Sequence, residues 1–265
     1  MSPLVSIVTP TYGRASFLSE TRRWVLAQTH ANFEWLILDD SPEPNPLFAP
    51  GGDPRIRYLH VPERLSVGDK RNRLAAAARG QYIAHFDDDD YYAPRYLESM
   101  VGALEAQGAD FVHLCSWYLY DLRHDFFGFW SLRAVLGLHY LCYADGLRIA
   151  SFTPQNNSTL QGNHLGYGFT YLYRREVAAA ARFAPVNWAE ESAFLDTVRQ
   201  RFKILSMDDQ SGLVLHVLHP GSTSSCFPQY HLPSFLVPSL FREPSAHLLA
   251  LRAQRSATGR TAPAG

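Results

Sequence analysis

The sequence predicts an α/β fold with parallel strands, and two observations support this prediction. Short apolar runs typical of buried strands alternate, along the first half of the chain, with longer stretches of helical periodicity. Two of the runs, at 33–38 and 82–86, end abruptly in aspartates. A strand, a helix and a strand in succession imply a right-handed parallel crossover, and open α/β sheets bind ligands beyond the carboxyl ends of their strands. Both acidic clusters should therefore face one crevice.

The N-terminal half follows this alternation throughout. Runs of β-branched and aromatic residues bounded by Pro, Gly or Asn predict strands, and apolar residues at every third or fourth position predict helices with one face on a sheet. Gly80 and Gly108 should end two helices, and Pro94 suits a first helical position. The expected elements are strands at 4–8, 33–38, 56–61 and 82–86, helices at 17–28, 68–79 and 94–108, and a loop at 41–54.

The second half is less regular. Aromatic residues crowd the segment 125–150 without clean periodicity, which suits either a buried connector or the lining of a sugar or lipid site. The polar, turn-rich segment 153–168 should be a mobile loop. The remaining expected elements are strands at 110–120, 169–173, 203–207 and 213–218 and helices at 176–183 and 187–202.

The character of the chain changes near Cys226, so we place one domain at 1–225 and an extension at 226–265. Prolines interrupt an apolar stretch there, and four arginines stand against the single acid Glu243. A helix is expected at 245–255, and the residues from 258 onward should be disordered. Such a tail suits peripheral contact with an anionic membrane, and it equally suits packing against the domain.

Composition narrows the function classes. A chain of 265 residues with 46% hydrophobic content can bury one large core, and a net charge of −1 gives no basic field for nucleic acid, which we exclude as a partner. The three cysteines are widely spaced and lack a C-x-x-C pair, which predicts reduced, buried thiols. No secretion signal or spanning segment is evident. We therefore expect a cytoplasmic protein, with membrane association limited to the cytoplasmic face.

Four consecutive aspartates at 87–90 carry the clearest chemical signal. At an effective dielectric near 20, two unit charges ~4 Å apart repel by about 4 kcal/mol, so a cation should lie beside them. Hard carboxylate oxygens suit Mg²⁺ or Mn²⁺, which proteins commonly hold with one or two carboxylates and substrate phosphates. The alternative is a solvated acidic turn that caps the helix beginning near Pro94.

Two further charged pairs stand at expected helix starts. Lys70 and Arg71 follow Gly68, so their side chains and the helix N–H groups could hold a phosphate, although ordinary surface cations would look the same. Glu190 and Glu191 fall in the first turn of the helix at 187–202. Acids are favoured there simply because they complement the helix dipole.

Four motifs in this order resemble the inverting, nucleotide-sugar-dependent glycosyltransferases of family 2, which have the GT-A fold. They are VSIVTPTYGR, FEWLILDDS, GDKRNRLAAAARGQYIAHFDDDDYYAP and HPGSTS. The resemblance covers roughly 3–225. It implies a mixed, mainly parallel sheet with helices on both faces. It also implies a nucleotide-sugar half at about 1–110, an acceptor half at 111–225 and a Mn²⁺ or Mg²⁺ cofactor.

The resemblance assigns the donor site by motif. Thr11 and Tyr12 should border the nucleobase, Asp40 should hydrogen-bond it, and Arg71 should face the base or the diphosphate. UDP is the favoured nucleotide, with dTDP and GDP as alternatives. The full set expected to bind the nucleotide sugar is Pro10, Thr11, Tyr12, Arg14, Asp39, Asp40, Lys70, Arg71, Asp87 and Asp88.

The same resemblance assigns the metal site and the catalytic base. Asp89, the last residue of the D-x-D motif, should bind the metal, with Asp87 and His219 as further ligands. The extra acids of this motif leave open which carboxylate does so. Glu191 should be the general base that deprotonates an acceptor hydroxyl of a glycan or other small molecule, with Glu190 as the other candidate.

Three other classes are weighed against this prediction. A haloacid-dehalogenase-type phosphatase also places D-x-D after a buried strand, but near the N-terminus. A nucleotidyltransferase would need a glycine-rich loop after the first strand. A catalytically silent nucleotide- or glycan-binding module would not need Asp40, Arg71, Asp89 and Glu191 together. The sugar, the acceptor and the oligomeric state are open at this point.

Overall fold

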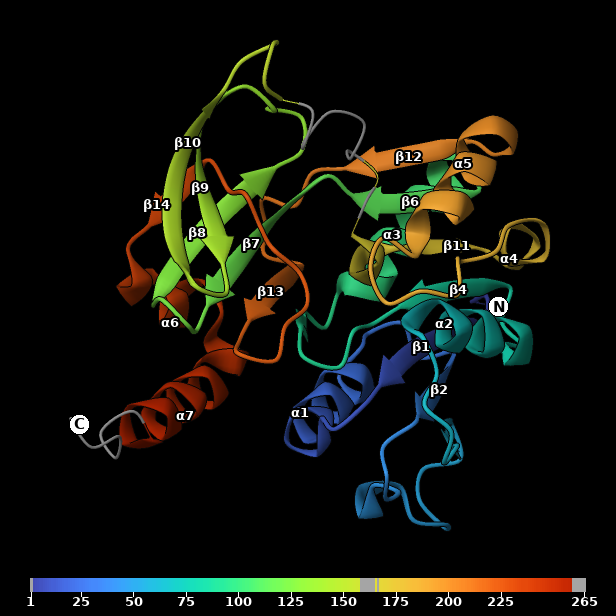
Figure 1. The fold of residues 1–265 in the computed structure, drawn as a ribbon. Helices are drawn as coiled ribbons and strands as arrows, with labels where there is room; N and C mark the ends of the chain where they lie inside the picture. The colour runs from blue at the N-terminus through green and yellow to red at the C-terminus, as the bar shows by residue number, and fades with distance from the viewer. Residues whose placement is uncertain (1, 158–164, 166, 259–265) are drawn as a thin grey trace. The chain divides into compact units, whose positions relative to one another are not determined.

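The structure is a computed structural model that describes residues 2–157, 165 and 167–258. The chain divides into two compact units, Met1–Cys115 with Gly162–Asp208 and Ser116–Gln161 with Asp209–Gly265 (Figure 1). These boundaries differ from the halves expected at 1–110 and 111–225, because the chain returns to the first sheet after residue 162. The assignment of those halves to donor and acceptor stays a prediction.

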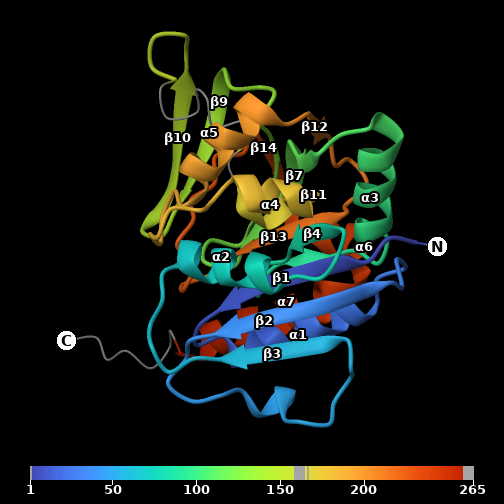
Figure 2. The same ribbon diagram turned by 90° about the vertical axis from the view of Figure 1, so that its right-hand side faces the viewer.

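A seven-stranded sheet forms the centre of the first unit. Its strands pair in parallel except β11, which lies antiparallel between β4 and β6, so the predicted mixed, mainly parallel sheet is confirmed. Strands β1, β2 and β3 lie side by side, and helix α2 packs on β1 and β2 (Figure 2). In spatial order the strands are β12 (Ile204–Met207), β6 (Phe111–Leu114), β11 (Leu172–Arg174), β4 (Tyr82–His85), β1 (Val5–Thr11), β2 (Phe33–Asp39) and β3 (Ile56–His60).

Both faces of this sheet are covered, as the predicted fold requires. Leu36 and Leu38 join the core cluster on one face, while Trp35 and Ile37 alternate toward the other, and none of the four is more than 2% exposed. The helices of this unit are α1 (Ala15–Leu26), α2 (Val67–Ala77), α3 (Tyr96–Gln107), α4 (Arg175–Ala180) and α5 (Glu191–Arg201). Two 3₁₀ turns, η1 (Pro46–Phe48) and η2 (Gly168–Thr170), and a short strand, β5 (Tyr91–Tyr92), complete it.

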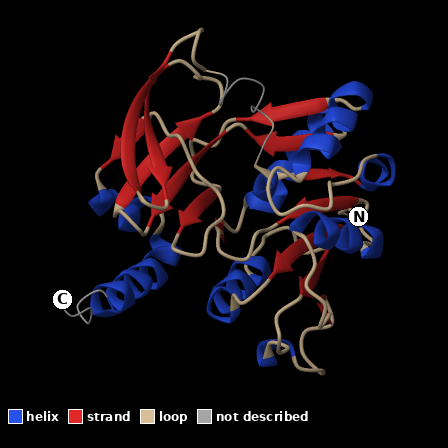
Figure 3. Ribbon diagram, viewed as in Figure 1, coloured by secondary structure: helices blue, strands red, loops and turns tan. Residues whose placement is uncertain are grey.

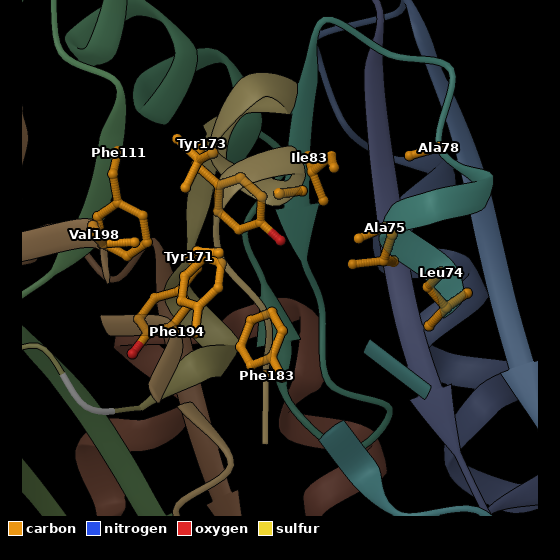
Figure 4. Packing of buried hydrophobic residues seen from close by; sticks show 14 of the residues in the cluster. Leu74, Ala75, Ala78, Ile83, Phe111, Tyr171, Tyr173, Phe183, Phe194 and Val198 are labelled. Carbon is orange, nitrogen blue, oxygen red and sulfur yellow. The ribbon is translucent and has the colours of Figure 1, made fainter. Parts of the chain in front are cut away.

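The core cluster joins α2, α4 and α5 to the sheet. Phe183 and Phe194 stack with ring centroids 4.2 Å apart, and Leu74 of α2 belongs to the same cluster (Figure 4). The start of α2 is capped by Ser66, whose hydroxyl oxygen accepts a hydrogen bond from the Asp69 N–H at 3.0 Å. This packing fixes the starts of α2 and α5, where the predicted charged residues lie.

The second unit is mostly β structure; the sequence predicted its strand at 213–218 but not the strands between residues 125 and 152. The segment expected to be an irregular connector folds into antiparallel strands, coloured red in Figure 3. Strands β14 (Tyr230–Leu232), β8 (Phe126–Ser131), β7 (Ser116–Asp121) and β13 (Val214–Leu218) are neighbours in one sheet. Strands β9 (Gly137–Tyr143) and β10 (Gly146–Phe152) form a hairpin.

There are two physical reasons why these strands were not predicted from the sequence. Strands β7 and β8 are buried on both faces along much of their length, so the polar alternation that marks a half-exposed strand is absent. The expected strand at 110–120 is in fact two strands, β6 and β7, which separate at Cys115 into different sheets. The hairpin turn between β9 and β10 ends at Asp145, and Gly146 is the first residue of β10; this Asp-Gly pair is a turn signal in the sequence.

The C-terminal segment forms regular structure within the second unit. Strand β14 pairs with β8, and η3 (Ser234–Leu236), α6 (Val237–Leu240) and α7 (Arg242–Thr258) follow. Helix α7 includes the expected helix at 245–255, while the expected disorder falls mostly outside the described residues. All three cysteines are free and buried, as predicted. Among the described helices, none has the length and apolar character needed to cross a membrane. Membrane contact stays a prediction.

Candidate active site

The predicted convergence of side chains at one sheet edge is present in the first unit. Strands β4, β1 and β2 are adjacent and parallel, so their carboxyl ends meet. Thr11 ends β1 and donates a hydrogen bond from its hydroxyl to the carboxylate of Asp88, beyond β4. Arg14, two residues beyond Tyr12, places Nη1 2.7 Å from Asp89 Oδ2. Pro10 lies half-buried in β1 just before these residues.

In the aspartate cluster Asp88 is buried, whereas the side chains of Asp87 and Asp89 are 28% and 15% exposed. Burial, reinforced by the charges of Asp90, Asp89 and Glu190, raises the pKa of Asp87 to about 6, although the Arg71 guanidinium opposes the shift. Burial and then the charge of Asp89 raise the pKa of Asp88 well above its usual value. These carboxyls therefore hold protons far more readily than exposed aspartates do, and a cation beside them would remove that penalty.

The donor atoms fit a divalent cation only if a ligand completes the site. Asp87 and Asp89 offer hard oxygens, but among the residues that the structure describes there is no group of three or more acidic, His or Cys side chains arranged to hold a metal. Mg²⁺ and Mn²⁺ sites of this kind take their remaining oxygens from substrate phosphates. His219 lies in the second unit, where its Nδ1 accepts the Gly221 N–H at 3.1 Å, and its role as a metal ligand stays a prediction.

Asp40 is the centre of a second polar cluster. Its side chain is fully buried, and Oδ1 accepts a hydrogen bond from Lys70 Nζ at 2.8 Å. Oδ2 accepts from the Leu65 N–H at 2.8 Å and from Arg64 Nη1 at 2.6 Å. Burial alone would raise the pKa of Asp40, but these hydrogen bonds outweigh it and lower the pKa. The group is therefore an ionised acceptor.

Lys70 is buried rather than displayed to a phosphate. Its ammonium also donates to the Thr11 carbonyl oxygen at 2.9 Å, and burial lowers its pKa although the Asp40 carboxylate opposes the shift. Asp39 is likewise engaged, since its carboxylate accepts hydrogen bonds from the Ser41 N–H at 2.9 Å and the Tyr58 hydroxyl at 2.7 Å. Of the two neighbouring aspartates, Asp40 lies in the cluster that reaches Tyr12 through Arg64.

Arg71 connects the aspartate cluster to the glutamate pair. It is 4% exposed, with Nε 3.2 Å from Glu190 Oε1 and Nη2 3.2 Å from Asp87 Oδ1. Its Nη1 lies 2.8 Å from His85 Nδ1. A guanidinium can only donate, so His85 Nδ1 accepts and the imidazole is neutral, consistent with the burial that lowers the pKa of His85 well below its usual value. In this structure Arg71 is a buried bridge between carboxylates.

A glycine makes room for this bridge. A Cβ built on Gly168 would lie 3.3 Å from Arg71 Nη2, so any larger residue would press on the guanidinium. The sequence signalled neither the bridge nor its partner His85, because burial and partnership are properties of the folded chain.

The glutamate pair stands at the start of α5, as predicted. Glu190 flanks the helix and Glu191 is its first residue, and Ala189 before them has a left-handed φ of 54°. Burial and then the charge of Glu190 raise the pKa of Glu191, outweighing the backbone N–H groups and Arg71 that lower it. A carboxylate with a raised pKa is suited to act as a general base. Glu190 is instead paired with Arg71.

The chain is similar in sequence to known glycosyltransferases. A family model described as Glycosyl transferase family 2 matches residues 6–180. The uncharacterized glycosyltransferase EpsJ of Bacillus subtilis (strain 168) is 28% identical over 230 residues, which are 84% of this chain and 63% of EpsJ. The chain thus spans less than two thirds of this curated relative.

Solved structures share the fold. S. aureus TarS 1-349 in complex with UDP has a TM-score of 0.59 and 15% identity, over 82% of this chain and 61% of that chain. The mannosyltransferase PcManGT from Pyrobaculum calidifontis, in complex with GDP-Man and Mn²⁺, has a TM-score of 0.55 and 15% identity, over 82% and 57% of the two chains. At this identity the likeness shows a common α/β fold, which confirms the predicted fold class.

Proposed function

Because the chain belongs to glycosyl transferase family 2, we propose that it transfers a sugar from a nucleoside diphosphate sugar to an acceptor hydroxyl, with inversion at the anomeric carbon. One observation carries this proposal. The first unit holds two chemically different carboxylate groups, the cluster of Asp87, Asp88 and Asp89 and the base-like Glu191, joined through the buried Arg71 and Glu190. A leaving-group site and a proton acceptor are the two requirements of this reaction.

The donor that we propose is a UDP-sugar. Asp40 is an ionised acceptor suited to the N3–H of uracil, and the ring of Tyr12, 41% exposed, offers a stacking face. The TarS structure that shares this fold contains UDP, whereas the PcManGT structure contains GDP-Man. The acceptor that we propose is a glycan or another small molecule with a nucleophilic hydroxyl.

We propose that Asp89 and Asp87 would hold Mn²⁺ or Mg²⁺ together with diphosphate oxygens. Bound there, a divalent cation would offset the negative charge that develops on the leaving diphosphate. Glu191 would take the proton of the acceptor hydroxyl as that oxygen attacks the anomeric carbon from the side opposite the diphosphate. Arg71 would hold Glu190 as a paired carboxylate, which leaves Glu191 as the group that accepts the proton.

The metal assignment predicts a loss of binding on one substitution. Asp89→Asn should weaken UDP binding in the presence of Mn²⁺ by about tenfold or more, because a neutral amide is a poor ligand for a hard divalent cation. Titration calorimetry with and without Mn²⁺ measures this directly. Asp196→Asn is the matched control, since it removes an acid from an exposed ion pair with Arg199 on α5. Equal Mn²⁺-dependent binding by Asp89→Asn and wild type would exclude Asp89 as the ligand.

A further inference from the structure

Arg64 occupies the place where the proposed nucleobase would bind. It lies in the loop between β3 and α2, outside all four sequence motifs. The centre of its guanidinium is 3.4 Å from the ring centroid of Tyr12, and its Nη1 is 2.6 Å from Asp40 Oδ2. One side chain therefore covers the aromatic face and occupies the carboxylate at the same time.

A nucleobase at this position would need the same two contacts. It would stack on Tyr12 and donate an N–H to Asp40. Asp40 Oδ2 already accepts two hydrogen bonds, from Leu65 N–H and from Arg64, so both of its lone pairs are engaged. A guanidinium is planar and delocalised, with N–H donors along its edge, which makes it a close chemical substitute for the N–H edge of a base.

Arg64 is also held loosely enough to leave. Its side chain is 53% exposed, whereas that of Asp40 is fully buried. Without Arg64, the carboxylate of Asp40 keeps its hydrogen bonds to Lys70 Nζ and to the Leu65 N–H. The Asp40 carboxylate would therefore stay in position, and one lone pair of its Oδ2 would become available to a nucleobase N–H.

We propose that Arg64 is a placeholder for the nucleobase: it closes the site when no donor is bound and is displaced when the base stacks on Tyr12. This inference rests on the proposed function and adds a residue that sets the affinity of the site for a nucleobase, while Asp40 selects among bases. A base can replace both contacts of Arg64 only if it supplies a flat face for Tyr12 and an N–H for Asp40. Uracil does so at N3. Cytosine has only an acceptor lone pair at N3, which would face the carboxylate of Asp40, and it could donate only from its exocyclic N4, displaced from the position of the uracil N3–H.

The test compares Arg64→Ala with wild type, using uridine as the probe. Uridine lacks phosphates, so loss of the Arg64 charge does not weaken its binding. In wild type, uridine can bind only after Arg64 has lost its half-exposed ion pair and its cation–π contact, and this loss weakens binding. Arg64→Ala has neither contact to lose, so it should bind uridine about three- to thirty-fold more tightly. Arg64→Lys, which keeps the charge but loses the planar group, should also bind uridine more tightly. Wild type should prefer uridine to cytidine.

Arg23→Ala is the matched control. Arg23 also pairs with an acid, Glu20, and also lies over an aromatic ring, that of Trp24, with 61% of its side chain exposed. Its removal should leave uridine affinity unchanged. Equal or weaker uridine binding by Arg64→Ala, with UDP still bound by wild type, would overturn the placeholder alone. If wild type binds neither uridine nor UDP with Mn²⁺ present, both the placeholder and the proposed donor site are wrong.

Discussion

Glu191→Gln should lower kcat by about 10²- to 10⁴-fold, the range expected when a general base is removed. Glutamine keeps the shape of the side chain but cannot take a proton. UDP affinity should stay near the wild-type value, because the residues proposed to bind the donor are untouched. If Glu191 only complements the dipole of α5, the substitution should cost at most ~1 kcal/mol of stability and leave turnover nearly unchanged. Steady-state kinetics with a UDP-sugar, together with calorimetry of UDP binding, separates these outcomes.

Glu190→Gln is the matched control for this prediction. Glu190 raises the pKa of Glu191, so its neutralisation should lower that pKa. A base must be ionised to act, and the wild-type rate should therefore fall as the pH drops through the raised pKa of Glu191. In Glu190→Gln this fall should begin at a lower pH. An inactive Glu190→Gln beside an active Glu191→Gln would reverse the two roles, and near-normal turnover by the double variant would remove both from the mechanism.

Arg71→Met should destabilise the fold by about 3 to 5 kcal/mol, the cost of breaking a buried ion pair from one side. Methionine fills similar volume but leaves the carboxylates of Asp87 and Glu190 without the guanidinium that bridges them. Urea denaturation measures the change in the free energy of unfolding. The control is Arg57→Met, because Arg57 is 28% exposed and pairs with one acid, Glu34, so its loss should cost less.

A second substitution distinguishes lost charge compensation from lost packing. Adding Glu190→Gln to Arg71→Met removes one of the two uncompensated charges, so the double variant should recover part of the lost stability. Arg71 does not stabilise the fold by pairing with these carboxylates if Arg71→Met lowers the free energy of unfolding by less than about 1 kcal/mol. The same conclusion holds if Glu190→Gln lowers the stability of Arg71→Met further.

The sequence predicted the first unit well because local and tertiary signals agree there. Strands β1, β2 and β4 are apolar runs that end at polar residues, and their parallel pairing brings these ends to one edge, where Thr11 and Asp88 share a hydrogen bond. In the second unit, the strand β13 and the helix α7 were predicted, whereas β8, β9 and β10 were missed. Strand β8, like β7, is buried along much of its length and lacks the polar alternation of a half-exposed strand. The apolar run at 110–120 divides at Cys115 into β6 and β7, which belong to different sheets. Such a division depends on contacts between residues distant in sequence.

The contacts within the candidate site could not be predicted from the sequence. Lys70 and Arg71 are cations at a helix start, which the sequence shows, but their burial and their pairing with Asp40, Asp87 and Glu190 arise only in the fold. Arg64 carried no signal, because a single arginine in a loop looks like any surface cation until Tyr12 and Asp40 are placed beside it.

A crystal structure of the protein with UDP and Mn²⁺ would show the proposed donor site itself. We expect uracil stacked on Tyr12 with its N3–H donated to Asp40, and Mn²⁺ bound by Asp89 and diphosphate oxygens. A nucleotide bound away from Tyr12 and Asp40, or a metal that touches none of Asp87, Asp88 and Asp89, would contradict the proposed site.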